Sequence, residues 1–164
     1  MRYFVEDKED FCVIKVFVSK RKGPVYEELP ALQKGEHVYE LLSSPGLALN
    51  LAKGDLINIE DPGSPAVVIR RGGNFCINLY AEHIDADTIS MLEAEVNSSL
   101  GGTLDGVYRG NLAFSVPARS GRDRIREVFN KLKEEAGIEW YYSNIYKNFN
   151  DLDDDTLLDW WLDS

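Results

Sequence analysis

The chain of 164 residues has no apolar run near the length needed to cross a bilayer, and it has only two cysteines. A membrane-spanning helix needs about 20 apolar residues, so none is expected. The charged start, MRYFVEDKED, does not resemble a secretory signal peptide. Cys12 and Cys76 both lie in apolar runs, which predicts buried thiols in a reducing compartment rather than a disulfide. We therefore expect a cytoplasmic protein with no membrane contact.

Catalytic motifs are also scarce. The two histidines are His37 and His83, and Cys76 lies seven residues before His83. An odd spacing sends two side chains to opposite faces of a regular strand, and no third group is placed to orient such a pair. The segment EHIDAD at 82–87 has neither zinc-finger spacing nor an EF-hand loop. We expect no catalytic residues, no metal and no cofactor, with an enzyme of unrecognised type using Cys76 or His83 as the alternative.

Positive charge is missing from the C-terminus. The formal net charge is -10, and the last fifteen residues, NDLDDDTLLDWWLDS, contain six aspartates and no lysine or arginine. Residues 1–149 therefore carry 22 acidic and 18 basic residues. An acidic protein repels phosphate backbones, so direct nucleic-acid binding is not expected. The same charge favours a basic protein partner and speeds association with it.

The first half of the chain, residues 1–73, is predicted to be rich in β-structure. Alternating or β-branched runs at 11–18, 25–32, 37–45, 54–60 and 66–70 predict short strands separated by polar or Pro/Gly-rich turns. Several short strands at close spacing favour a small bent sheet or a barrel-like sheet.

The second half, residues 74–147, alternates strands and helices. Strand patterns cover 74–82, 103–117 (two strands) and 138–146, while 85–102 and 120–137 have helical apolar spacing closed by glycines. The order β-α-β-β-α-β predicts a ferredoxin-like half with two helices on one face of an antiparallel sheet. The fold class is therefore α+β, and the two halves are expected to pack into one compact unit.

Several short motifs together resemble a bacterial family known only as domain of unknown function 4265. The matching motifs are Pro45, Gly54–Asp55, Pro117 and Trp140–Tyr142, within YELLSSPGLALNLAKGDLINIE, VVIRRGGNFCINLY, GNLAFSVPA and IEWYY. The resemblance spans about residues 12–146. Where that family tends to have Ser-Gly-His, this chain has Arg71-Gly72-Gly73-Asn74. The resemblance implies a bacterial cytoplasmic protein and a fold, but hardly an activity.

The acidic and aromatic segment 148–164 lies outside this resemblance. A short helix there would place Leu157, Leu158, Trp161 and Leu162 on one face and aspartates on another. Such a helix is marginal alone and needs an apolar surface, either on its own domain or on a partner. Adjacent tryptophans among aspartates are typical of an interface with aromatic anchors and a charged rim. The predicted partner contacts are Asp153, Asp154, Asp155, Asp159, Trp160 and Trp161.

The leading functional hypothesis is a non-enzymatic protein-binding protein. Small acidic proteins of this size are similar in character to immunity proteins, which neutralise toxins delivered by competing cells, as in contact-dependent growth inhibition. The expected partner is a basic toxin domain, most concretely a nuclease, which would be blocked by occlusion. The alternative is a regulatory domain that binds a small ligand between the two halves, near Arg70–Asn74 and the loop SSPG at 43–46.

Overall fold

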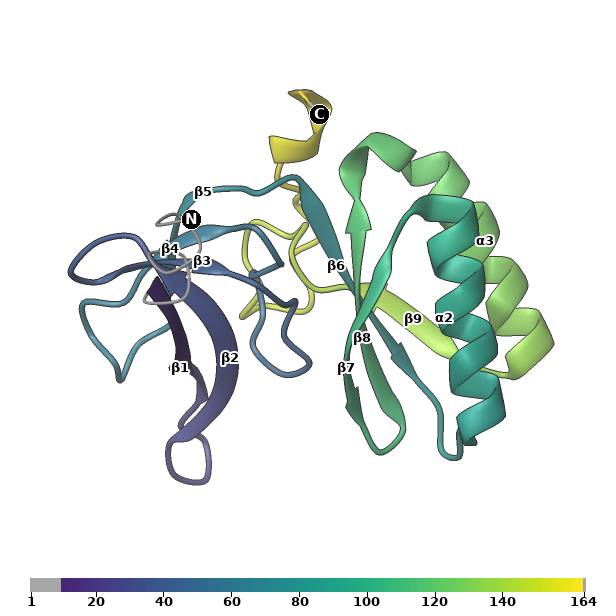
Figure 1. Cartoon of the computed structure of the whole chain (residues 1–164), viewed down its shortest axis with the longest axis horizontal. Helices are drawn as coiled ribbons and strands as arrows, with labels where there is room; N and C mark the ends of the chain where they lie inside the picture. The colour runs from purple at the N-terminus through teal and green to yellow at the C-terminus, as the bar shows by residue number, and fades with distance from the viewer. Residues whose placement is uncertain (1–9, 164) are drawn as a thin grey trace, which may run out of the picture.

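Two antiparallel sheets and two α-helices form the chain in the computed structural model, which describes residues 10–163 (Figure 1). The first sheet has the order β1-β2-β3-β4-β5. Its strands are β1 (Phe11–Ser19), β2 (Val25–Gln33), β3 (Val38–Leu41), β4 (Leu56–Asn58) and β5 (Val67–Arg70). The predicted α+β class is confirmed at this level.

The first sheet is open, so the barrel-like form of the prediction is wrong. Within residues 10–163, β1 and β5 are its two edges and do not pair with each other. Each of β1 and β2 has nine residues, whereas β3, β4 and β5 have only three or four. Strands this short give too few ladder hydrogen bonds at one edge to close the sheet on itself.

The second sheet has the order β7-β8-β6-β9, and all its neighbouring strands are antiparallel. Its elements along the chain are β6 (Asn74–Tyr80), α2 (Ala86–Leu100), β7 (Thr103–Tyr108), β8 (Asn111–Pro117), α3 (Arg122–Ala136) and β9 (Glu139–Tyr142). Asp85 caps α2 by accepting a hydrogen bond from the N–H of Thr88 at 2.7 Å, and Gly101 ends it with a positive φ. No helix among the described residues is long and apolar enough to span a membrane.

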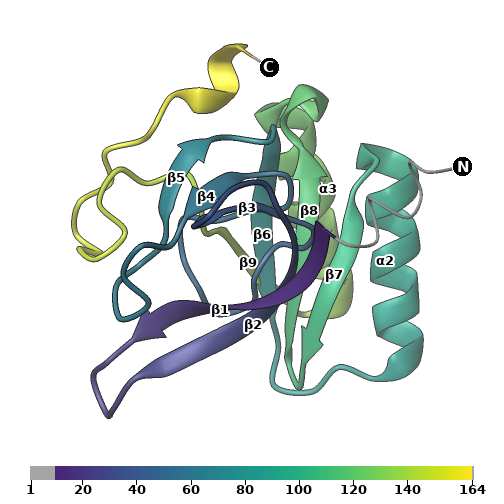
Figure 2. The ribbon, with the colours of Figure 1, turned by 60° about the vertical axis from the view of Figure 1, so that its left-hand side comes forward.

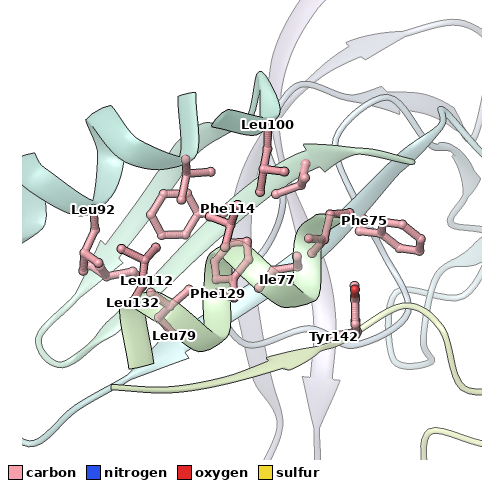
Figure 3. Packing of buried hydrophobic residues seen from close by; sticks show 14 of the residues in the cluster. Phe75, Ile77, Leu79, Leu92, Leu100, Leu112, Phe114, Phe129, Leu132 and Tyr142 are labelled. Carbon is pink, nitrogen blue, oxygen red and sulfur yellow. The ribbon is translucent and has the colours of Figure 1, made fainter. Parts of the chain in front are cut away.

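The main core lies between the second sheet and its two helices, which cover one face of that sheet (Figure 1). Phe75, Ile77 and Leu79 alternate along β6 and belong to this core, with Phe75 at the end near Tyr142 (Figure 3). Residues between them, such as Cys76 and Asn78, are also buried, because the other face of β6 meets the loop that joins β3 to β4. The central strands of this sheet are therefore buried on both faces.

Polar contacts hold the first sheet and the loop 42–55 against the second sheet. Glu27 of β2 is buried and accepts hydrogen bonds from the N–H groups of Gly46, Leu47 and Ala48 at 2.8–2.9 Å. Ser44 of the same loop bonds to the hydroxyl of Ser115 on β8 at 2.6 Å. Since buried carboxylates and amides need partners, these bonds fix where the loop lies between the sheets.

The C-terminal segment is not the short helix that its periodicity predicts. Only Trp160–Asp163 forms a helical turn, of the 3-10 type. Asp151 and Asp154 instead accept hydrogen bonds from backbone N–H groups two residues further on, at 3.0 Å, which turns the chain and competes with helix. Backbone bonds from Lys147 to Thr156 and from Leu158 to Ile145 then fold the segment back along the end of the domain (Figure 2).

Candidate functional site: an acidic aromatic groove

Tyrosine and aspartate side chains surround a hollow of about 340 Å³. We call this hollow the acidic groove. It lies where β9, the loop 47–50 and the C-terminal segment meet. Its lining residues are Leu49, Tyr141, Tyr142, Ser143, Tyr146, Asn148, Phe149, Asp151, Leu152, Asp154 and Asp155.

Apolar surface in the acidic groove is open to solvent. Tyr141 is 46% exposed, Leu49 is 41% exposed and Tyr146 is 39% exposed. Leu152, at the tip of a turn between two aspartates, is 98% exposed. A single exposed leucine is ordinary, but a contiguous set with aromatic rings is typical of a contact surface.

The turns of the C-terminal segment place the groove's carboxylates. The N–H of Asp153 bonds to Asp151, and the N–H of Thr156 bonds to Asp154, so each turn is held by the side chain it displays. Hydrogen bonds from the side chain and the N–H of Thr156 lower the pKa of Asp154, with a smaller contribution from the charge of Lys147. Asp154 is therefore a carboxylate at neutral pH, available to a cationic group.

The predicted contact residues divide into two sets. Asp154 and Asp155 line the acidic groove, whereas Asp153 and Asp159 are exposed beside it. Trp160 and Trp161 turn the other way and are half-buried against Phe75, with ring centroids 5.1 and 5.7 Å from it. Their role in a partner contact stays a prediction.

Both tryptophans anchor the end of the chain on its own domain. The indole N–H of Trp160 donates to the carbonyl of Asn144 at 3.0 Å. The guanidinium of Arg71 lies 5.7 Å from the Trp160 ring, and that of Arg122 lies 5.4 Å from the Trp161 ring. Such cation–π contacts and ring packing hold the segment that carries the groove's aspartates.

Cys76 and His83 do not form a catalytic pair. The thiol of Cys76 is fully buried, 3.4 Å from the carbonyl of Pro45, and burial raises its pKa to about 12. A protonated, buried thiol is a poor nucleophile. His83 is exposed beyond the end of β6, with four strand residues at about 3.3 Å each between Cys76 and that end.

The turn Arg71–Asn74 serves the junction between the sheets. Arg71 forms an ion pair with the buried carboxylate of Asp55 at 3.3 Å, and the N–H of Gly72 donates to the same carboxylate at 2.9 Å. Burial outweighs both contacts and raises the pKa of Asp55 to about 6. Because Gly54 closely approaches Gly72, a side chain at Gly72 would collide with backbone.

Within residues 10–163, one of the two predicted small-ligand edges borders an open hollow, and the small-ligand hypothesis stays a prediction. Gly72, Gly73 and Asn74 border an open hollow with Pro117 and Arg119, but the loop 43–46 is not part of it. Ser44, Pro45 and Gly46 are buried between the sheets. Among residues 10–163, no group of three or more histidine, cysteine, aspartate or glutamate side chains could hold a metal ion.

The apolar half of the acidic groove was not predicted from the sequence. Leu49 and Phe149 are separated by a hundred residues, and their neighbours Tyr141 and Tyr146 match the pattern of an ordinary strand. The feature of the sequence that could have indicated this apolar lining is the density of tyrosines just before the acidic segment.

A comparison with solved structures shows which fold this chain shares. A crystal structure described as that of a hypothetical protein from Neisseria gonorrhoeae has a similar fold, with a TM-score of 0.58 and 17% sequence identity. The similarity covers 82% of this chain and 93% of that one. At this identity it shows a shared α+β fold alone. No curated protein matches the chain.

The family follows from the sequence match. The family described as Domain of unknown function (DUF4265) matches residues 27–140. This chain belongs to that family, which confirms the resemblance drawn from Pro45, Gly54–Asp55, Pro117 and Trp140–Tyr142. The acidic end of the chain lies outside the matched range.

Proposed function

We propose that this chain is a non-enzymatic protein-binding protein, an immunity protein that neutralises a basic, nuclease-type toxin domain by occlusion. The observation that carries the proposal is the acidic groove, where exposed tyrosines and leucines lie beside the carboxylates of Asp151, Asp154 and Asp155. Protein interfaces combine aromatic anchors with a polar rim in this way.

Charge complementarity supports a basic partner. The chain carries a net charge of -10, and six of its acidic residues lie in the segment that borders the groove. Nuclease clefts are basic because they hold phosphates, so an acidic surface attracts them over distance and competes with the nucleic acid. The mechanism is steric and electrostatic blockage, with no turnover of the partner.

In this proposal the acidic residues and the tryptophans have separate roles. Asp154 and Asp155 contact the partner in the groove, and Asp153 and Asp159, outside it, add long-range attraction to a basic partner. Trp160 and Trp161 hold the C-terminal segment in place by packing on Phe75. The free cysteines support action in a reducing bacterial cytoplasm.

We also propose a ferredoxin-like classification for the second sheet. The element order β6-α2-β7-β8-α3-β9, the spatial order β7-β8-β6-β9 and the antiparallel pairing support it. The two helices on one face leave the other face free for the loop 42–55, and that packing places Leu49 at the groove.

Growth protection tests the proposed function. The proposal predicts that a toxin domain is encoded beside this gene. That domain is expressed from an inducible promoter with the wild-type chain, with Asp154→Lys/Asp155→Lys, or with Asp153→Lys/Asp159→Lys as the charge-matched control. We expect full protection by the wild type, loss of protection with the groove variant and smaller loss with the control. A wild-type chain that is expressed and folded yet gives no protection contradicts the proposal.

A second candidate function rests on the size of the groove. A volume of about 340 Å³ falls within the usual range for small-molecule sites, about 300–1,000 Å³. Its carboxylates and rings would suit a cationic amine. Thermal unfolding with polyamines and amino-acid amides tests this candidate, which predicts a concentration-dependent rise in Tm that is absent in Asp154→Asn/Asp155→Asn.

A further inference from the structure

A second hollow of about 330 Å³ adjoins the acidic groove, and both are lined by Leu49 and Phe149. The second hollow runs to the end of β1 and the turn after it. Its lining residues are Phe17, Val18, Ser19, Lys20, Arg21, Leu49, Pro65, Phe149 and Asn150. We call the two adjoining hollows, with Leu49 and Phe149 between them, the long groove.

The charges along this long groove are of opposite sign at its two ends. Asp151, Asp154 and Asp155 line one end, and Lys20 and Arg21 line the other. Among the described residues, no ion pair includes any of these five side chains. Lys147 lies near Asp154 and Lys20 lies near Asp61, so each end keeps a net charge that is only partly offset.

A ligand that complements both ends must itself have separated charges of opposite sign. Extended peptide fits this requirement, since neighbouring residues lie about 3.3 Å apart along the backbone and can carry cationic, apolar and acidic side chains in order. A single small cation would fill one end only. A nucleic acid would place phosphates against the aspartates.

We propose that the long groove binds an extended segment of the partner protein in which an arginine, a large apolar residue and an acidic residue occupy alternate positions in that order, so that all three side chains point to the same face. The inference rests on the proposed function, because it assumes a protein partner. The arginine lies among Tyr141, Tyr146 and the carboxylates of Asp154 and Asp155. The apolar residue covers Leu49 and Phe149, and the acidic residue faces Lys20 and Arg21.

Arginine suits the acidic end better than lysine for a chemical reason. Its guanidinium is planar and weakly hydrated, so it packs on aromatic rings while its N–H groups bond to carboxylates. A lysine ammonium keeps more of its water and makes less ring contact. The chain already packs its own Arg122 against Tyr142, with the guanidinium carbon 5.1 Å from the ring centroid.

Short synthetic peptides test the inference without the partner. The probe is acetyl-Arg-Ser-Leu-Ser-Glu-amide, and its controls replace arginine by neutral, isosteric citrulline or leucine by alanine. Binding is followed by the amide NMR shifts of Leu49, Phe149 and Asp155. We expect saturable shifts at these residues and at least about tenfold weaker binding for the citrulline peptide, because a charge-assisted hydrogen bond is lost.

Matched protein variants separate the groove from general negative charge. Asp154→Asn/Asp155→Asn keeps acceptors for the local turns, including the N–H of Thr156. We expect it to weaken the arginine peptide about tenfold and to remove the preference over citrulline. Asp153→Asn/Asp159→Asn removes the same charge outside the groove and should change binding less than threefold. Lys20→Gln/Arg21→Gln should remove the preference for glutamate over glutamine in the peptide.

Several results would overturn the inference. The first is that the arginine and citrulline peptides bind with equal affinity. The second is that the two aspartate double variants change the peptide affinity equally. The third is that the amide NMR shifts do not saturate. A dimer in sedimentation experiments that the groove variants dissociate would instead assign the groove to a second copy of this chain. If the toxin domain binds equally well to Asp154→Asn/Asp155→Asn, the inference fails while the proposed function stands. If the peptides bind as expected but the toxin domain does not, the proposed function fails alone.

Discussion

The substitution Glu27→Gln tests whether one buried carboxylate holds the junction between the sheets. Glu27 accepts the N–H of Gly46 with one oxygen and the N–H groups of Leu47 and Ala48 with the other, at 2.8–2.9 Å. A glutamine has one acceptor oxygen, so its amide group would face an N–H donor and leave that donor without a partner. Tyr108, whose hydroxyl lies 3.4 Å from Glu27, could accept from the new amide but could not satisfy the orphaned N–H.

The expected loss of unfolding free energy in Glu27→Gln follows from the energies of these hydrogen bonds. A buried donor without an acceptor costs about 1–3 kcal/mol, and hydrogen bonds to a neutral acceptor are weaker than those to a charged one. Relief from burying a charge offsets part of this, which leaves about 2 kcal/mol of destabilisation. With a urea m-value of about 2 kcal/mol/M, the unfolding midpoint should fall by about 1 M.

Equilibrium urea unfolding, followed by tryptophan fluorescence, measures this change. Glu28→Gln is the matched control, because Glu28 is the next residue of β2, carries the same charge and is exposed. We expect the control to remain within about 0.5 kcal/mol of the wild type. If Glu27→Gln and Glu28→Gln have the same stability, the carboxylate does not hold the junction and the reasoning is refuted.

Three further predictions concern the anchor of the C-terminal segment, the buried ion pair and the thiols. Trp160→Ala should lower the unfolding free energy by about 2 kcal/mol, since a half-buried ring and its hydrogen bond are lost, whereas Leu162→Ala at a 74% exposed site should change it little. Asp55, with a folded pKa of about 6 against its ordinary 3.8, binds its proton more tightly in the folded state, so its contribution to stability is greatest below about pH 4 and is lost as the pH rises through 6. That loss amounts to about 3 kcal/mol and should be absent from the pH dependence of Asp55→Asn in urea unfolding between pH 4 and 7. A thiol reagent at pH 8 should modify half-buried Cys12 in the native protein and reach Cys76 only after unfolding, so two rapidly reacting native thiols would contradict the burial of Cys76.

The regular elements could be predicted because their signals are local. Helix α2 shows apolar residues at helical spacing between Asp85 and Gly101, and the structure has both caps at these residues. The strands of the second sheet likewise follow alternating or apolar runs, since β6 and β8 are buried on both faces. Family membership could be predicted because its motifs keep their order along the chain.

The groove and the C-terminal turn could not be predicted because they depend on contacts between distant residues or on competing local bonds. Leu49 and Phe149 meet only after both sheets have packed. The helical spacing of Leu158, Trp161 and Leu162 was real, but the side chains of Asp151 and Asp154 bond to nearby N–H groups and favour turns instead. The spacing of apolar residues does not indicate whether helix or these side-chain hydrogen bonds will be the more stable.

Calorimetric titration of the chain with a purified toxin domain, taken from the neighbouring gene that the proposal predicts, decides whether the acidic groove binds a protein partner. We expect one-to-one binding with a Kd below about 1 μM, which corresponds to about -8 kcal/mol. We also expect Asp154→Lys/Asp155→Lys to weaken this binding at least about a hundredfold, while Asp153→Lys/Asp159→Lys weakens it less. No detectable heat with the wild-type chain, or equal affinity for all three forms, would contradict the assignment of the acidic groove as the partner-binding site.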